Sequence, residues 1–133
     1  MSIINYCCTA GKISLFSDIN FNEKTVQNYT TKTQFIFRIS KGVLDTMDDK
    51  RLNSYTRESE RTIPYRNMIY IGDGLTDVPC MKLIRDRGGE SIALFHGKNK
   101  SLSQKLLLEK RVGFICPANY SKNSELEITV KTI

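Results

Sequence analysis

Apolar residues in the second half of the chain gather into short continuous runs, which alternate with segments of helical spacing. The first run is closed by glycine, and such continuous apolar runs are typical of strands buried on both faces of a sheet. The runs are MIYIG at 68–72, SIALF at 91–95 and VGFICPA at 112–118. The segments 77–89 and 100–111 between them have helical spacing, with Pro79 in a first turn and Gly88-Gly89 at an end. This order predicts right-handed βαβ units, a parallel sheet and hence the α/β class.

The preceding part of the chain predicts one further helix and a hairpin. Apolar residues of segment 32–44 recur at helical spacing, with Thr31 as the expected N-cap and Gly42 near the end. SIINYCC and KISLF, separated by a short turn sequence with a glycine, predict a β-hairpin. We therefore divide the chain into a poorly defined N-terminal segment, 1–31, and an α/β domain, 32–133.

Two other segments have weaker patterns. Residues 45–67 are charged and interrupted by Pro64, which is typical of an exposed loop or insertion. Residues 124–133, SELEITVKTI, are compatible with either a helix or a strand.

Composition places the chain among small soluble domains and narrows the set of partners. The 133 residues have a formal net charge of +6 and no apolar stretch near the ~20 residues that a membrane span needs. The N-terminus lacks a signal pattern, so we expect a cytoplasmic location and no membrane partner. Lysines and arginines are scattered without an aromatic platform, so nucleic acid is not an expected partner. Such a basic surface favours anionic ligands.

Cysteine and histidine usage argues against a zinc or histidine site. Cys7, Cys8, Cys80 and Cys116 do not have Cys-x-x-Cys spacing and form a poor disulfide framework. We interpret them as reduced, mostly buried thiols. His96, the single histidine, has no evident partner in the sequence.

The most informative stretch is the turn that follows the run 68–72. Gly72 and Gly74 let the backbone bend and a ligand approach, while Thr76 can cap the following helix. Asp73 and Asp77 lie four residues apart across this turn, where two carboxylates would suit a hard, oxygen-seeking cation such as Mg²⁺. The alternative is an ordinary turn in which Asp77 is a surface acid that caps the helix.

The stretch MIYIGDGLTDVPCMK closely resembles the fourth motif of the haloacid dehalogenase (HAD) superfamily, in which an apolar strand ends in G-D-x-x-x-D. The following GGESIALF and RVGFICPANY are similar to the next strands of that fold. The resemblance covers roughly residues 30–120. It implies a Rossmann-like, three-layer α/β/α core with a parallel sheet, a Mg²⁺ cofactor and hydrolysis of a phosphorylated small molecule.

The resemblance also implies roles for individual residues. In the family, a lysine before the motif steadies the phosphate and the charge of the nucleophile; Lys32 is our first candidate and Lys41 our second. Its effect would be electrostatic, a fixed cation facing the transferring phosphoryl group. The expected site is therefore catalytic Lys32 and Asp73, metal-binding Asp73 and Asp77, and a phosphate-facing turn of Gly72, Gly74 and Thr76.

The family's aspartate nucleophile has no clear counterpart. Family chemistry needs a D-x-D pattern at the end of a first strand, and the nearest candidate, Asp18 with Asn20, lacks its continuation. Only thirteen residues separate Asp18 from Lys32, fewer than the family places there. We therefore expect a partial HAD-like domain, a truncated or split form whose phosphatase turnover is near background. The alternative is a non-catalytic binding or interaction module that keeps the fold.

Absence of the nucleophile strand would leave the run 68–72 at a sheet edge with unpaired backbone groups. Three arrangements could cover that edge: the N-terminal hairpin, a second copy of the chain, or a separate chain that supplies the missing half. We therefore expect self-association or a complementing N-terminal chain among the partners.

Overall fold

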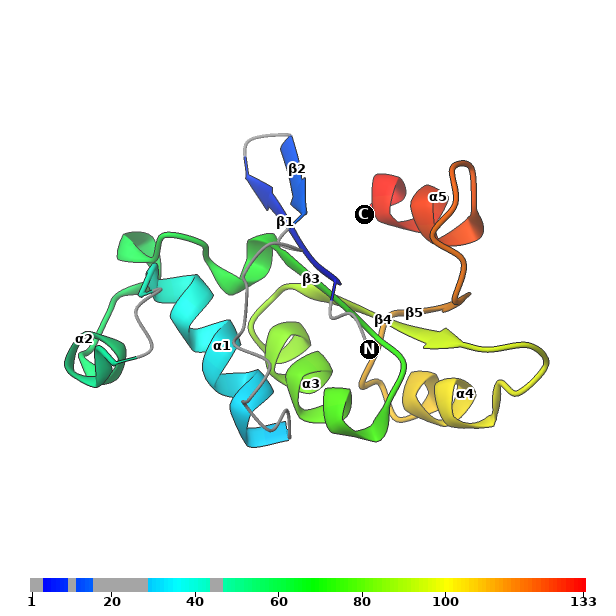
Figure 1. Cartoon of the computed structure of the whole chain (residues 1–133), viewed down its shortest axis with the longest axis horizontal. Coiled ribbons are helices and arrows are strands. Elements are labelled where there is room, and N and C mark those ends of the chain that lie inside the picture. The colour runs from blue at the N-terminus through cyan, green and yellow to red at the C-terminus, as the bar shows by residue number, and fades with distance from the viewer. Residues whose placement is uncertain (1–3, 10–11, 16–28, 44–46) are drawn as a thin grey trace.

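The computed structural model describes residues 4–9, 12–15, 29–43 and 47–133, which form a five-stranded sheet with helices on both faces (Figure 1). The strands are β1 (Ile4–Thr9), β2 (Lys12–Leu15), β3 (Met68–Gly72), β4 (Glu90–Phe95) and β5 (Phe114–Pro117). The helices are α1 (Tyr29–Lys41), α2 (Asp49–Asn53), α3 (Val78–Asp86), α4 (Ser101–Leu108) and α5 (Glu125–Thr132). Short 3₁₀ turns cover Glu58–Glu60, Tyr65–Asn67 and Leu75–Asp77.

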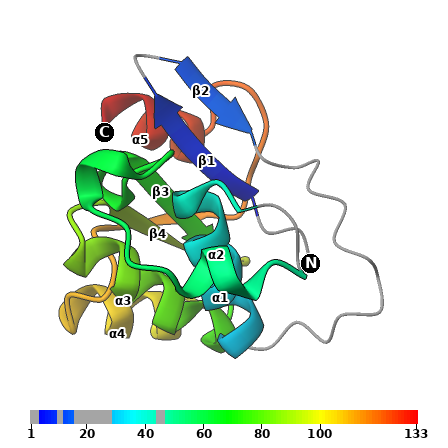
Figure 2. The same ribbon diagram turned by 90° about the vertical axis from the view of Figure 1, so that its left-hand side faces the viewer.

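The three predicted strands form the parallel part of the sheet, which confirms the α/β class. The sheet order is β2-β1-β3-β4-β5, and β3 pairs with β4, and β4 with β5, in parallel. Helices α1, α3 and α4 cover one face, and α5 covers the other (Figures 1 and 2). The described part of the chain contains no helix with the length and apolar character of a membrane span.

The side chains of the parallel strands form two apolar layers, because successive side chains of a strand point to opposite faces of the sheet. One layer joins β3 and β4 to α1, α3 and α4 and includes Ile36, Tyr70, Met81, Ala93 and Leu106. The other packs the opposite face against α5; it consists of Ile69, Ile71, Ile92, Leu94, Cys116, Leu126 and Val130. Both faces of β3 and β4 are thus buried, which explains why their sequences are continuous apolar runs.

The predicted hairpin is confirmed, and it covers the edge of β3. β1 and β2 pair antiparallel, with Thr9 opposite Lys12. β1 also pairs antiparallel with β3, with Ile4 opposite Ile71. The sheet is therefore mixed rather than wholly parallel, and the first of the three expected arrangements supplies the neighbour of β3. The side chains of β1 and β2 lie outside the described residues.

Several helix boundaries differ from the sequence prediction. α1 begins at Tyr29, so Thr31 lies inside the helix rather than at its N-cap; Gly42 does end it, with a positive φ of 70°. The segment predicted as a loop contains α2 and two 3₁₀ turns, and it buries Ile63. The last segment is a helix because the Ser124 hydroxyl accepts a hydrogen bond from the Glu127 N–H as an N-cap.

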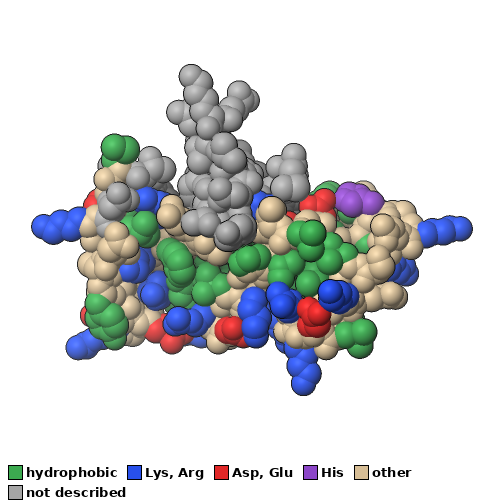
Figure 3. All heavy atoms as spheres, turned by 90° about the horizontal axis from the view of Figure 1, so that it is seen from below, with side chains coloured by type: hydrophobic (Ala, Val, Ile, Leu, Met, Phe, Trp, Pro, Cys, Tyr) green, Lys and Arg blue, Asp and Glu red, His purple; other side chains and the backbone are tan. Residues whose placement is uncertain are grey.

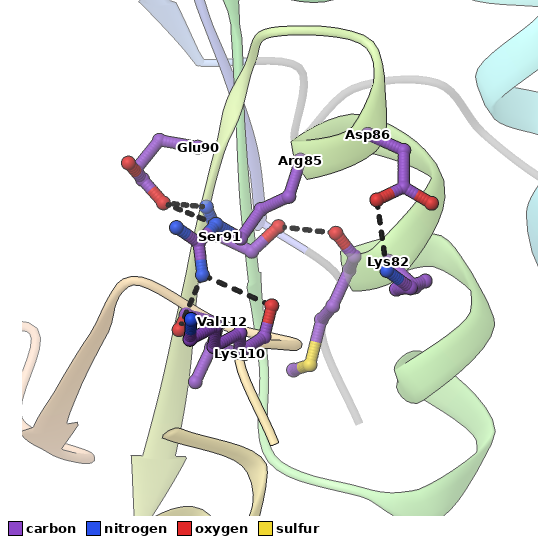
Figure 4. Close-up of polar contacts among 8 residues, drawn as sticks. Lys82, Arg85, Asp86, Glu90, Ser91, Lys110 and Val112 are labelled. Carbon is purple, nitrogen blue, oxygen red and sulfur yellow. Dashed lines mark hydrogen bonds and ion pairs between the residues drawn. The ribbon is translucent and has the colours of Figure 1, made fainter. Parts of the chain in front are cut away.

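A set of polar contacts at the amino end of β4 locks α3 to the sheet (Figure 4). The Ser91 hydroxyl, which is fully buried, donates to the Met81 carbonyl at 2.8 Å. The Arg85 guanidinium donates to the Val112 and Lys110 carbonyls at 2.8 and 3.1 Å, and its Nε lies 3.2 Å from Glu90. The Arg85 bonds give the Lys110 and Val112 carbonyls, in the turn before β5, a hydrogen-bond donor.

The helical side of the molecule mixes apolar and basic side chains (Figure 3). A shallow groove of about 350 Å³ lies between the start of α3 and α4, and Leu75, Pro79 and Leu102 contribute to its lining. Lys105 and Arg111 lie beside it. The positive charge is thus spread over this surface, as the scattered lysines and arginines predicted.

We expect Gly89→Ala to destabilise the fold by about 2–3 kcal/mol, because the added Cβ would overpack the strand start. It would lie 2.3 Å from the Tyr65 carbonyl oxygen and 2.8 Å from that of Met68, and backbone atoms cannot move aside cheaply. Gly97→Ala is the matched control: it meets nothing within 4 Å and only a positive φ of 58° opposes it. Its cost should be about 1 kcal/mol. Urea denaturation measures both, and equal losses would contradict the steric explanation.

Candidate active site

The Gly72–Asp77 turn lies at the carboxyl end of β3, where α/β proteins usually bind ligands. Gly72 ends the strand, and the 3₁₀ turn Leu75–Asp77 leads directly into α3. The Asp77 side chain folds back over this turn, and its Oδ2 accepts hydrogen bonds from the backbone N–H groups of Asp73 at 3.2 Å and Gly74 at 3.1 Å. The predicted turn and its position on a buried strand are thus confirmed.

Asp77 is buried and faces the first candidate lysine. Its Oδ1 lies 2.7 Å from Lys32 Nζ, and the two side chains are 3% and 1% exposed. Tyr70 donates its hydroxyl to the same oxygen at 2.7 Å. With two donors on each oxygen, all four acceptor positions of the carboxylate are occupied. Asp77 is therefore not the surface acid of the alternative, although its carboxylate does cap the 3₁₀ turn by accepting the Gly74 N–H.

Lys32 joins α1 to the turn by a second bond. Its ammonium also donates to Thr76 Oγ1 at 2.9 Å, so two of its three N–H groups are used by described residues. Lys41, the second candidate, lies at the other end of α1 and donates to the carbonyls of Leu52 and Ser54. Of the two candidate lysines, only Lys32 therefore reaches the turn.

Glycine at position 72 is required by the Asp77 carboxylate rather than by backbone bending. A Cβ at this position would lie 2.6 Å from both Cγ and Oδ2 of Asp77. At Gly74, φ is −126°, which any residue can adopt, and a Cβ would meet Asp77 Oδ2 at an ordinary 3.6 Å. Packing in the turn therefore requires glycine at position 72, whereas a side chain could be accommodated at position 74.

Burial keeps two groups beside Asp77, Tyr70 and Cys80, neutral. Burial, together with the nearby Cys80 and Asp77, raises the pKa of Tyr70 far above its usual 10, so its hydroxyl remains a donor. Burial also raises the pKa of Cys80 to about 11. Cys80 and Cys116 are buried free thiols, as expected, and a neutral Cys80 is a poor nucleophile.

Asp73 differs from Asp77 in exposure and partner. Its side chain is 30% exposed, and Oδ2 lies 2.9 Å from Nε2 of His96, which is 71% exposed. The expectation that His96 has no partner is thus wrong. The signal was in the sequence: Asp73 is the residue after β3 and His96 the residue after β4, and neighbouring parallel strands end at the same edge.

The turn therefore contains two different carboxylates: Asp73 can still accept a ligand, whereas all four acceptor positions of Asp77 are occupied. Among the described residues, no group of three or more His, Cys, Asp or Glu side chains is arranged to hold a metal. The nucleophile candidate Asp18 lies outside the described residues. β1, which occupies the place beside β3, has the sequence INYCCT and carries no acid.

Comparison with known proteins adds one relative. The chain is 34% identical over 102 residues to an uncharacterized protein of Borreliella burgdorferi. The match covers 74% of this chain and 34% of the relative, so the chain spans about a third of the relative's length. No family model and no solved structure matches the chain.

We expect Asp77→Asn to destabilise the fold by about 3–5 kcal/mol, because it leaves the Lys32 ammonium buried without a counter-charge. Asp86→Asn, the same substitution in the exposed pair with Lys82, should cost about 0.5 kcal/mol or less. Urea denaturation of both variants measures the difference. Similar losses would show that the buried pair has no special role.

Proposed function

We propose that this chain carries the lysine and magnesium-binding part of a haloacid dehalogenase-type phosphohydrolase site. The observation that supports the proposal is the buried Lys32–Asp77 pair at the carboxyl end of β3, with Asp73 exposed beside it. Lys32 comes from a distant part of the chain and reaches the turn, as expected of the phosphate-steadying lysine that the family resemblance implies. An ordinary solvated turn has no reason to bury a lysine.

Each side chain of the site has a different role. Asp77 is a positioning residue: its carboxylate holds Lys32 and the backbone N–H groups of Asp73 and Gly74 in place. Lys32 supplies a fixed positive charge next to the phosphate, and it costs no reorganisation when charge builds up there. Gly74, which is half-buried, has no side chain that would keep a phosphate away from the backbone of the turn.

The donor set fits Mg²⁺ held through one carboxylate. Mg²⁺ commonly takes one or two carboxylates and fills its other positions with water and phosphate oxygens. Asp73 has a free Oδ1 among the described contacts, while Asp77 could contribute only through water or by giving up an existing bond. When bound, the ion would neutralise phosphate charge; the residues described here hold and orient it.

The chemistry still needs a nucleophile that the described residues do not supply. β1 occupies the strand position next to β3 and has no aspartate to offer. We therefore propose that hydrolysis requires an aspartate from another chain, and that this chain alone turns over substrate at background rates. The relative, about three times the aligned length, is compatible with a larger complete protein.

A second candidate function is a non-catalytic binding module with the same fold. The observation that favours it is the saturation of Asp77, whose four acceptor positions are filled by Lys32, Tyr70 and two backbone amides. In such a module the turn would be a structural element, and Asp73 would have no metal to bind.

Magnesium titration separates the two functions. We expect wild-type chain to bind Mg²⁺ weakly in calorimetry, and Asp73→Asn to weaken binding by roughly tenfold or more, since it removes the one open carboxylate. Asp86→Asn is the matched control, an exposed acid at the end of the following helix, α3, to which the proposal gives no metal role. Equal Mg²⁺ affinity in wild type and Asp73→Asn would favour the non-catalytic module.

Turnover of p-nitrophenyl phosphate tests the missing nucleophile. The wild-type chain in Mg²⁺ should match the Asp73→Asn variant and the buffer blank, because no aspartyl-phosphate can form. Mg²⁺-dependent hydrolysis that is lost in Asp73→Asn would show that this chain is a complete enzyme.

A further inference from the structure

A second polar pocket lies at the opposite end of α1 from the Gly72–Asp77 turn. It has a volume of about 490 Å³, within the range of small-molecule sites. Its lining combines the end of α1, the region around α2 and the segment before β3, and consists of Lys41, Asn53, Ser54, Tyr55, Thr56, Glu58, Arg61, Tyr65 and Arg87. Lys41 is nine residues beyond Lys32, so the two sites are roughly 14 Å apart along the helix. Figure 2 shows α2 beside α1 on this side of the molecule.

The charge of this pocket is positive. Three cations line it, Lys41, Arg61 and Arg87, against the single acid Glu58. Glu58 is already paired with Arg66, at 2.7 Å between Oε1 and Nη1. No described carboxylate forms an ion pair with Arg61 or Arg87, so their charges are available to a ligand.

Buried groups hold Arg61 in place. Its guanidinium carbon lies 4.8 Å from the centroid of the Tyr65 ring, and Nη1 donates to Ser40 Oγ at 3.0 Å. Ser40 is fully buried and Tyr65 is 4% exposed. The Phe37 ring meets Tyr65 edge-on, with centroids 6.4 Å apart, which fixes the plane of the tyrosine. Arg61 is thus oriented before any ligand arrives.

Arg87 supplies a second guanidinium beside the same ring. Its carbon lies 6.0 Å from the Tyr65 centroid, and the side chain is exposed. Burial raises the pKa of Tyr65, an effect that the Arg61 charge only partly offsets, so the phenol stays neutral and uses up neither positive charge. Guanidinium groups bind phosphate through paired N–H donors, and such charge-assisted bonds are strong.

We propose that this pocket binds the phosphate group of a small molecule through Arg61 and Arg87. Arg61 is the preset contact, and Arg87 closes on the ligand from the exposed side. Tyr55, 89% exposed at the rim, offers an aromatic face to an organic part of the same ligand. The site is independent of the proposed magnesium site, because none of its lining residues belongs to the Gly72–Asp77 turn.

Calorimetry tests the proposal: inorganic phosphate, AMP and adenosine are each titrated into the protein in the presence of EDTA. The same titrations are then repeated with the Asp73→Asn variant. We expect phosphate and AMP to bind to both the wild-type and the Asp73→Asn protein, and Arg87→Gln to weaken the affinity for both ligands by roughly tenfold. Arg111→Gln is the matched control, the same substitution at an exposed arginine of another surface. If AMP binds more tightly than phosphate, the natural ligand is a nucleotide; if the two affinities are equal, it is free phosphate. Either result supports the site.

Three results would overturn the proposal. They are the absence of binding by either anion, unchanged affinity in Arg87→Gln, and adenosine binding as tight as AMP. Arg61→Lys provides a second test, since it keeps the charge but removes the paired donors; unchanged phosphate affinity in a folded Arg61→Lys chain would also count against it. Because EDTA removes magnesium, failure here leaves the proposed phosphohydrolase site untouched.

Discussion

The ion pair between Lys32 and Asp77 is the contact on which the arrangement of the helical layer depends. It joins residues 45 positions apart, with both side chains withdrawn from water. Removing two charges from water costs several kcal/mol per ion, which only good geometry and further hydrogen bonds offset. The Tyr70 hydroxyl and two backbone amides supply those bonds. The pair therefore fixes where α1 lies against the turn, more than it adds net stability.

The sheet allows this pair to form because β3 is buried on both faces and paired on both edges. Tyr70 points to the face that α1 and α3 cover, while Ile69 and Ile71 point to the face that α5 covers. β1 and β4 occupy the two edges, one antiparallel and one parallel. A strand held from four sides is a rigid platform, which is what a turn with closely spaced polar groups needs.

The two ends of α1 carry different chemistry. At its start, one lysine is buried against an acid, and its charge is largely committed to the fold. Near its end, three cations line a pocket together with the neutral Tyr65 and a single acid that is already paired. At the first end the positive charge is already paired within the protein. At the second end the cations are left to pair with a bound anion. Both ends fit the anionic ligands that the overall positive charge favours.

The sequence by itself determined most of the sheet and of the helical layer, and it identified the acids of the turn. Continuous apolar runs identified β3, β4 and β5, helical spacing identified α1, α3 and α4, and the Asp73–Asp77 spacing identified the candidate site. Tertiary structure alone decided that Asp77 is buried against Lys32, which of the three possible arrangements covers β3, and that Arg61 and Arg87 share one tyrosine. Local periodicity follows from backbone geometry, whereas these contacts join residues far apart in the chain. Only packing of the sheet and helices brings such residues within reach.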